Sequence, residues 1–282
     1  MTGSLKNIGY KRGPSFVSAL VDNGFITEKL FSLEIGQSNE DKFIHFGSPL
    51  ENRMKDPEAI RYVSLLDDLF WATNCQGFAF EGLENNYRFP NLDSEYIKNN
   101  QLYSVFDSES SHLVLPEFFF QPYVEKIFDM TTGKDYEVSE GKILTKCYDS
   151  FPALHFMFDK IWLTVSPNDY VIDISADQDR SLCQLSIVAG SQPFLVMGLP
   201  LLMDYYTVHN DKIGSIGFVP RAGSAKDGPY WGTVPTRTFS LSTTGVEWDL
   251  GLSDDKSWSG GIDRQGWGKK ETENAPPAES VK

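Results

Sequence analysis

The sequence has few basic residues and no long apolar run. Its longest apolar stretches, 113–115 and 194–202, are far shorter than the roughly 20 residues that a membrane-spanning helix requires. Residues 1–10 contain no apolar segment typical of a signal peptide, so the compartment stays open. The chain carries 25 Lys and Arg against 39 Asp and Glu, which gives a formal net charge of −14. This charge argues against nucleic acid and anionic membrane surfaces as partners, and we expect no membrane insertion.

Cysteine and histidine are scarce as well, since the chain contains three cysteines and four histidines. No spacing of these residues is typical of a zinc site, so we expect no metal and no cofactor. Composition leaves two arrangements of Cys75, Cys147 and Cys183 open. One disulfide can form with one thiol left over, or all three can remain buried thiols.

Apolar and aromatic residues are plentiful, at 40% and 13% of the chain. A chain of 282 residues with this composition is globular and can bury a sizeable core. Residues 14–33 read as a short helix followed by a strand, because their apolar residues share one helical face before a glycine ends it. Residues 116–130 read as a second helix, and the alternation at 151–158 predicts a strand.

The most informative stretch is 103–116. It begins as a predicted strand and delivers Asp107 to a turn. The turn is polar, with the residues Ser108, Glu109 and Ser110, and an apolar run that ends in proline follows. A carboxylate at the end of a strand, among hydroxyl groups, is a candidate for catalysis.

This stretch resembles the second active-site hairpin of the pepsin-like aspartic peptidases, Asp-Thr/Ser-Gly-Thr/Ser followed by an apolar run and Pro. Glu109 departs from the pattern, since the family has Gly at that place. Further resemblances to the C-terminal lobe of that family occur in the correct order along 14–220. They are Phe31-Ser32-Leu33, the run QGFAFEG at 76–82, the run PALHFMF at 152–158, the triplet Val196-Met197-Gly198, and the run YYTVHN at 205–210, where the family has YY-x-V-F-D.

The resemblance implies an all-β fold, namely a single pepsin-like aspartic-peptidase lobe with a few short helices. The change in composition after residue 220 adds an extended C-terminal tail. It also implies a disulfide between Cys147 and Cys183, where the family closes a loop. Residues 56–71 show helical spacing of apolar residues after a good helix start at Asp56-Pro57. The family has strands in this region, and we therefore expect strands.

The expected organisation has four parts. They are a remnant or linker at 1–13, the lobe at 14–220, a Trp- and Gly-rich extended tail at 221–270 and a disordered end at 271–282. The tail contains Trp231, Trp248, Trp258 and Trp267. These side chains either bind a protein partner, since Trp is enriched at interface hot spots, or lie on the chain's own lobe as the tail wraps it.

A pepsin-like enzyme uses two carboxylates about 3 Å apart that share one proton, one from each lobe. The resemblance makes Asp107 one of these groups, with Ser108 and Ser110 orienting it. With Glu109 in place of Gly, it implies a catalytically impaired family member that serves as a structural or binding subunit, with a protein partner or a second lobe. The alternative is an active aspartic endopeptidase acting on peptides, with the second Asp supplied by a missing N-terminal lobe or a partner copy.

Overall fold

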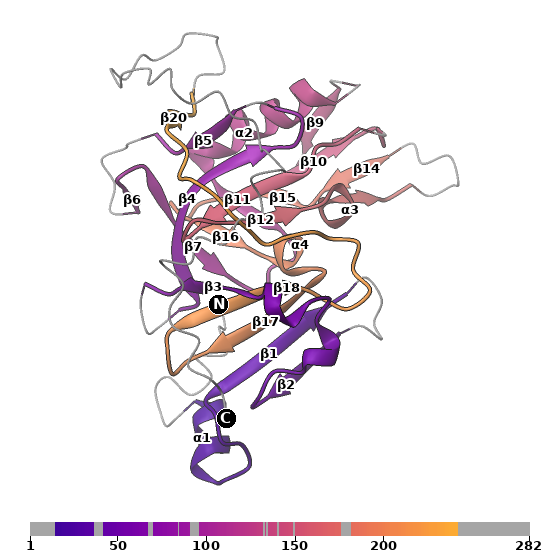
Figure 1. The fold of residues 1–282 in the computed structure, drawn as a ribbon. Helices are drawn as coiled ribbons and strands as arrows, with labels where there is room; N and C mark the ends of the chain where they lie inside the picture. Colours follow the sequence, from indigo (N-terminus) through magenta and orange to yellow (C-terminus); the bar gives the residue numbers. More distant parts are fainter. Residues whose placement is uncertain are drawn as a thin grey trace.

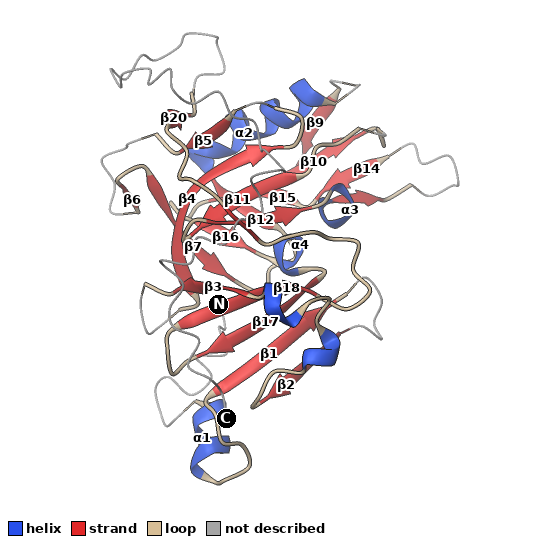
Figure 2. Ribbon diagram, viewed as in Figure 1, coloured by secondary structure: helices blue, strands red, loops and turns tan. Residues whose placement is uncertain are grey.

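The structure is a computed structural model, which describes residues 15–36, 42–66, 70–83, 85–90, 96–131, 133, 135–139, 141–148, 150–175 and 182–241. Within these residues the strands form three sheets and the helices are short, which confirms the predicted all-β fold (Figures 1 and 2). None of the described helices is long and apolar enough to cross a membrane. The predictions made for 1–13, for 271–282 and for Trp248, Trp258 and Trp267 lie outside the described residues.

The first sheet is antiparallel, with its strands in the spatial order β2-β1-β17-β18-β3. The strands are β1 (Leu30–Ile35), β2 (Lys42–Phe46), β3 (Arg61–Ser64), β17 (Tyr205–Asn210) and β18 (Ser215–Pro220). The sheet therefore pairs segments that lie far apart in the chain. Helix α1 (Phe16–Asp22) precedes it, and its first turn is capped by the Ser15 hydroxyl, which accepts from the Ser18 amide at 3.2 Å.

Within 56–71, the described residues form a strand at Arg61–Ser64, as the family pattern predicts, and no α-helix of the kind that their spacing allows. Short 3-10 turns, η3 (Glu51–Arg53) and η4 (Pro57–Ala59), lead into β3. β3 pairs with β18 and buries Val63 completely. Pairing and burial within the sheet thus override the local helical period.

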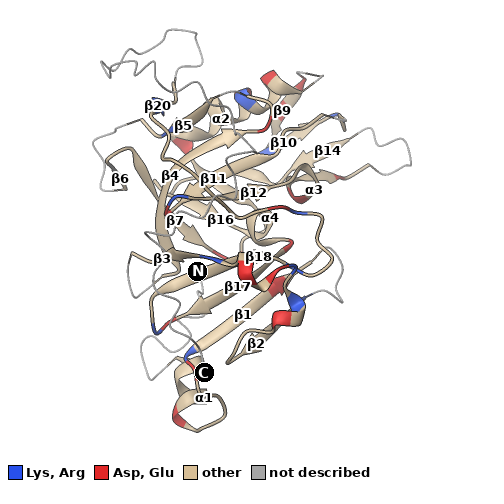
Figure 3. Cartoon of the chain, viewed as in Figure 1, with Lys and Arg blue, Asp and Glu red and all other residues tan. Residues whose placement is uncertain are grey.

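The second and largest sheet runs in the order β15-β8-β16-β7-β4-β11-β12-β19, with β5, β6 and β20 beside it. Its strands are β4 (Ala72–Phe80), β5 (Asn86–Arg88), β6 (Ile97–Lys98), β7 (Gln101–Phe106), β8 (Leu113–Pro116), β11 (Leu154–Phe158), β12 (Ile161–Val165), β15 (Ile187–Gly190), β16 (Leu195–Met197), β19 (Tyr230–Trp231) and β20 (Arg237–Thr238). The strands from β15 to β19 in this order contain no Lys, Arg, Asp or Glu, and Figure 3 shows few charged positions at the sheet centre. Such a composition is typical of strands that are covered on both faces.

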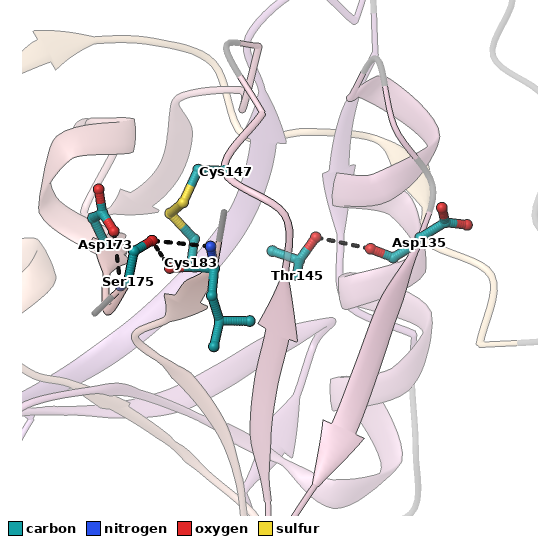
Figure 4. The surroundings of a disulfide bond; sticks show 7 residues. Asp135, Thr145, Cys147, Asp173, Ser175 and Cys183 are labelled. Atoms are coloured by element: carbon teal, nitrogen blue, oxygen red, sulfur yellow. Dashed lines mark hydrogen bonds between the residues drawn. A yellow bond between two sulfur atoms is a disulfide. The ribbon is translucent and has the colours of Figure 1, made fainter. Parts of the chain in front are cut away.

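The third sheet is small, with the order β13-β14-β10-β9. Its strands are β9 (Tyr136–Ser139), β10 (Lys142–Thr145), β13 (Val171–Asp173) and β14 (Cys183–Leu185). A disulfide joins Cys147 to Cys183 across 36 positions, with 5.0 Å between their Cα atoms (Figure 4). Closing a loop of this length stabilises the fold by about 4 kcal/mol through the unfolded chain. Cys75 is buried as a free thiol and donates to the Gly77 carbonyl.

Three more helices pack on these sheets: α2 (Glu117–Met130), α3 (Pro167–Tyr170) and α4 (Leu199–Leu202). The residues of α2 that helical spacing directs toward the core, Phe119, Val124, Ile127 and Phe128, are all 2% exposed or less. They join an aromatic core in which Phe78 contacts Phe119.

Residues 221–241, which we call the strap, continue past the last strand of the first sheet and wrap the lobe (Figure 1). Within the strap, β19 pairs with β12 and β20 pairs with β5. Trp231 lies in β19, where it is half-buried and packs against the core of its own lobe. The described part of the tail is therefore integrated into the lobe.

Candidate active site

Asp107 directly follows β7 and is buried, with 8% of its surface exposed. The strand reaches this point through a buried run, because β7 lies between β16 and β4 in the interior of the largest sheet. The Asp107 amide donates to the Met197 carbonyl at 3.0 Å, so the residue is tied to the neighbouring strand β16 as well as to β7.

The turn after Asp107 is closed by its own hydrogen bonds. The Glu109 amide donates to Asp107 Oδ1 at 3.0 Å, and the Ser110 amide donates to the Asp107 carbonyl at 3.3 Å. The Ser110 hydroxyl donates to the His112 carbonyl at 2.9 Å. Ser108 and Glu109 are exposed at the tip, while Ser110 is half-buried. Of the three predicted residues, Asp107 and Ser110 are thus built into the turn, and Ser108 faces outward.

Gly198 lies directly beneath this turn. β16 runs parallel to β7 and antiparallel to β8, so it passes between the two strands of the hairpin and delivers Gly198 to the turn. A Cβ atom at Gly198 would overlap the carbonyl oxygens of Ser110 and His112. The following amide, of Leu199, donates to the Ser110 carbonyl at 2.8 Å. Only a glycine allows this approach of backbone to backbone.

His112 follows the turn and is half-buried. Its Nδ1 lies 2.9 Å from the Ser111 hydroxyl. Burial lowers the pKa of His112, and the charge of Lys142 lowers it further. The histidine therefore favours its neutral form, and no hydrogen bond to Asp107 is among those described.

The other sequence-predicted residues lie elsewhere. The disulfide of Cys147 and Cys183 is in the third sheet, and Trp231 is in β19. Among the described residues, potential metal ligands come close in one group, Cys147, Asp173 and Cys183. Its two sulfur atoms are joined to each other and are not available as thiolate ligands. Gly198 was included in a family motif from the sequence, but the amide of Leu199 was not identified, because a backbone donor leaves no signal in the residue type.

Comparison with known proteins agrees with this geometry. The family model of eukaryotic aspartyl proteases matches residues 4–221. The chain is 21% identical over 207 residues to gastricsin of Mus musculus. This match covers 72% of this chain and 49% of that protein. It is also 21% identical over 201 residues to vacuolar protease A of Arthroderma otae. This match covers 70% of this chain and 45% of that protein. The chain spans about half the length of the curated relatives it matches. The predicted resemblance is confirmed, and the chain belongs to the eukaryotic aspartyl protease family.

Proposed function

We propose that this chain forms a lobe of an aspartic-peptidase-type protein with impaired peptide-bond hydrolysis, and that it serves as a structural or binding subunit of an assembly. One observation carries the proposal. Glu109 is exposed at the tip of the Asp107 hairpin, at the place where the family has glycine.

The reason is both steric and electrostatic. Hydrolysis of this type requires a second carboxylate about 3 Å from the first, with one proton shared between the two. A glycine at the tip lets a second hairpin approach closely, because it has no side chain. Glu109 adds a side chain and a negative charge beside Asp107 at the point of approach. A third carboxylate in so small a space opposes the formation of the pair.

A second candidate function is active aspartic endopeptidase. It is favoured by the retained geometry of Asp107, which is buried, tied to β16 and hydrogen-bonded within its turn. It is also favoured by relatives that are named gastricsin and vacuolar protease A. Under this candidate Asp107 is one half of the pair, and a second lobe or a partner copy supplies the other half.

A peptide-cleavage assay at acidic pH, with and without pepstatin, separates the two candidates. It is run on this chain and on any longer natural product that contains it, beside the variants Asp107→Asn and Glu109→Gly. We expect the unaltered protein to match Asp107→Asn at background turnover. Turnover that pepstatin inhibits and that Asp107→Asn abolishes would contradict the proposal. A gain of such turnover in Glu109→Gly would assign the impairment to this residue.

The assembly role is tested by size-exclusion chromatography with mass measurement. A subunit that associates with copies of itself is expected to exceed the 31.8 kDa of one chain. Replacing Trp248, Trp258 and Trp267 together by Ser is expected to return the mass to one chain, because Trp side chains commonly anchor interfaces. A mass of one chain for both proteins would leave self-assembly without support.

A further inference from the structure

The strap carries a lysine into the interior of the lobe. The Lys226 side chain is 1% exposed, and the Asp169 side chain that it meets is 2% exposed. A buried ammonium group is costly unless it is paired and fully hydrogen-bonded. Lys226 also lies beyond 4–221, the part of the chain that matches the family.

The ammonium group has three donors and meets three partners. Its Nζ lies 3.0 Å from Asp169 Oδ2 and donates to the Met203 carbonyl at 2.6 Å. It also lies 4.5 Å from the centroid of the Tyr205 ring, a cation–π contact. Burial lowers the pKa of Lys226, and the Asp169 carboxylate opposes that shift. Burial likewise raises the pKa of Asp169 against the opposite effect of Lys226.

The contact with Met203 leads to the Asp107 turn through α4. Met203 ends this helix, and its amide donates to the Leu199 carbonyl at 2.7 Å. At the other end of the helix, the Leu199 amide donates to the Ser110 carbonyl at 2.8 Å. Because α4 is a single turn, holding Met203 also holds the amide that fixes the hairpin.

A second path leads to the outgoing strand through α3. Asp169 lies in this helix and accepts from the Ser166 amide at 3.0 Å. The carbonyl of Tyr170, the last residue of α3, accepts from the Ser186 amide at 2.6 Å. The Ser186 carbonyl in turn accepts from the amide of Leu113, the first residue of β8, at 2.9 Å.

Lys226 therefore joins α3 to α4, and each of these helices leads to one side of the hairpin. Figure 1 shows the orange strap passing beside both helices. We infer that Lys226 is a positioning residue. Through its contacts with Asp169 and Met203, it holds the turn and the outgoing strand of the Asp107 hairpin in place. The inference goes beyond the proposed function, because it concerns the geometry of the hairpin whether or not the site hydrolyses peptides.

Hydrogen exchange of the full chain, followed by mass spectrometry, tests this role without reference to activity. Lys226→Met removes the ammonium group and keeps an unbranched side chain. The double variant Lys226→Met with Asp169→Asn removes the link without leaving a buried charge unpaired. In both variants we expect the amides of 107–113 and 198–203 to exchange about tenfold faster or more, while those of β1 and β2 keep their rates.

Asp227→Asn is the matched control, because this neighbouring side chain on the strap is 76% exposed and pairs with Lys55 at the surface. It is expected to leave exchange at the hairpin unchanged. Unchanged exchange at the hairpin in both Lys226 variants would overturn the inference. An equal rise in all segments would also overturn it, since that result marks general destabilisation. Restored protection in the double variant would overturn it too, because the effect would then belong to an unpaired charge and not to the missing link.

Discussion

In the Asp107 turn, the contacts that folding requires differ from those that aspartic-peptidase catalysis would require. The carboxylate accepts a backbone amide from Glu109, a contact that almost any residue at that position can provide. Glu109 is not among the residues with positive φ, so the turn itself does not require glycine there. Under the proposed function, the effect of the replacement falls outside the lobe, where a second carboxylate would have to approach.

His209 is a second residue whose chemistry departs from the family pattern, which carries Phe at this place. Its ring stacks on Phe31 with 4.5 Å between centroids and meets the edge of Trp71 at 4.8 Å. Its Nε2 lies 3.0 Å from the Thr207 hydroxyl. Burial lowers the pKa of His209 to about 3, because the charged ring would lose its hydration inside the core.

This burial predicts a specific loss of stability in acid. Between pH 6.5 and pH 3 the unfolded chain binds a proton at His209 and the folded chain does not, so stability falls as the pH falls, by about 1.4 kcal/mol per pH unit. We expect His209→Phe to remove this component. Urea denaturation at pH 7, 5 and 4 measures the difference between the two proteins. Thr207→Val, which keeps the buried histidine, is expected to retain the slope, and an equal slope in His209→Phe would refute the prediction.

At the scale of the element, β16 determines where the hairpin lies. It pairs with the incoming strand in parallel and with the outgoing strand in antiparallel orientation, so the two strands of the hairpin are separated by a third. The Asp107 turn then closes over the end of β16 at Gly198. An element with three residues thus decides the geometry of the site.

Gly198→Ala is therefore expected to destabilise the lobe by about 2 kcal/mol or more, because the new Cβ would overlap two backbone carbonyl oxygens that cannot move alone. Gly214→Ala provides the comparison. Gly214 has a φ of +60° and open space around it, so its replacement costs about 1 kcal/mol from backbone conformation alone. Chemical denaturation ranks the two variants, and a smaller loss at Gly198 would contradict the packing that we describe.

At the scale of the whole molecule, the strap makes the lobe larger than the part that matches the family. Its last described section inserts Phe239, 6% exposed, among core rings. The ring centroid lies 5.0 Å from that of Phe78 and 5.2 Å from that of Tyr87. Aromatic rings in such contacts bury large apolar areas, so the strap contributes to the stability of the core.

We accordingly expect Phe239→Ala to lower the free energy of unfolding by about 3 kcal/mol, through lost apolar burial and the cavity that remains. Val234→Ala, on the same strap but 36% exposed, is expected to change it by about 0.5 kcal/mol or less. Guanidinium denaturation of the full chain measures both. Equal stability of Phe239→Ala and the unaltered protein would show that the strap does not pack in solution as described.

Local patterns in the sequence predict much of the fold. The helical period places the apolar residues of α2 on one face, and alternation identifies β11, because both signals depend only on neighbouring residues. The order of family motifs places Asp107 at the end of a strand, and the structure then places Gly198 beneath it. At 56–71 the two sources of information disagree, and the strand pairing of β3 decides between them.

The family, the all-β class and the position of Asp107 could all be predicted from residue types, since these features depend on motifs in a fixed order. The packing of the strap, in contrast, could be seen only in the folded lobe. Lys226 lies in a polar, glycine-containing segment, where a lysine is ordinarily expected at the surface. Its burial depends on Asp169 and Met203, which are far from it in sequence and lie beside it only in the folded lobe. A contact between distant segments leaves no local period, and this is the physical reason why the sequence did not reveal it.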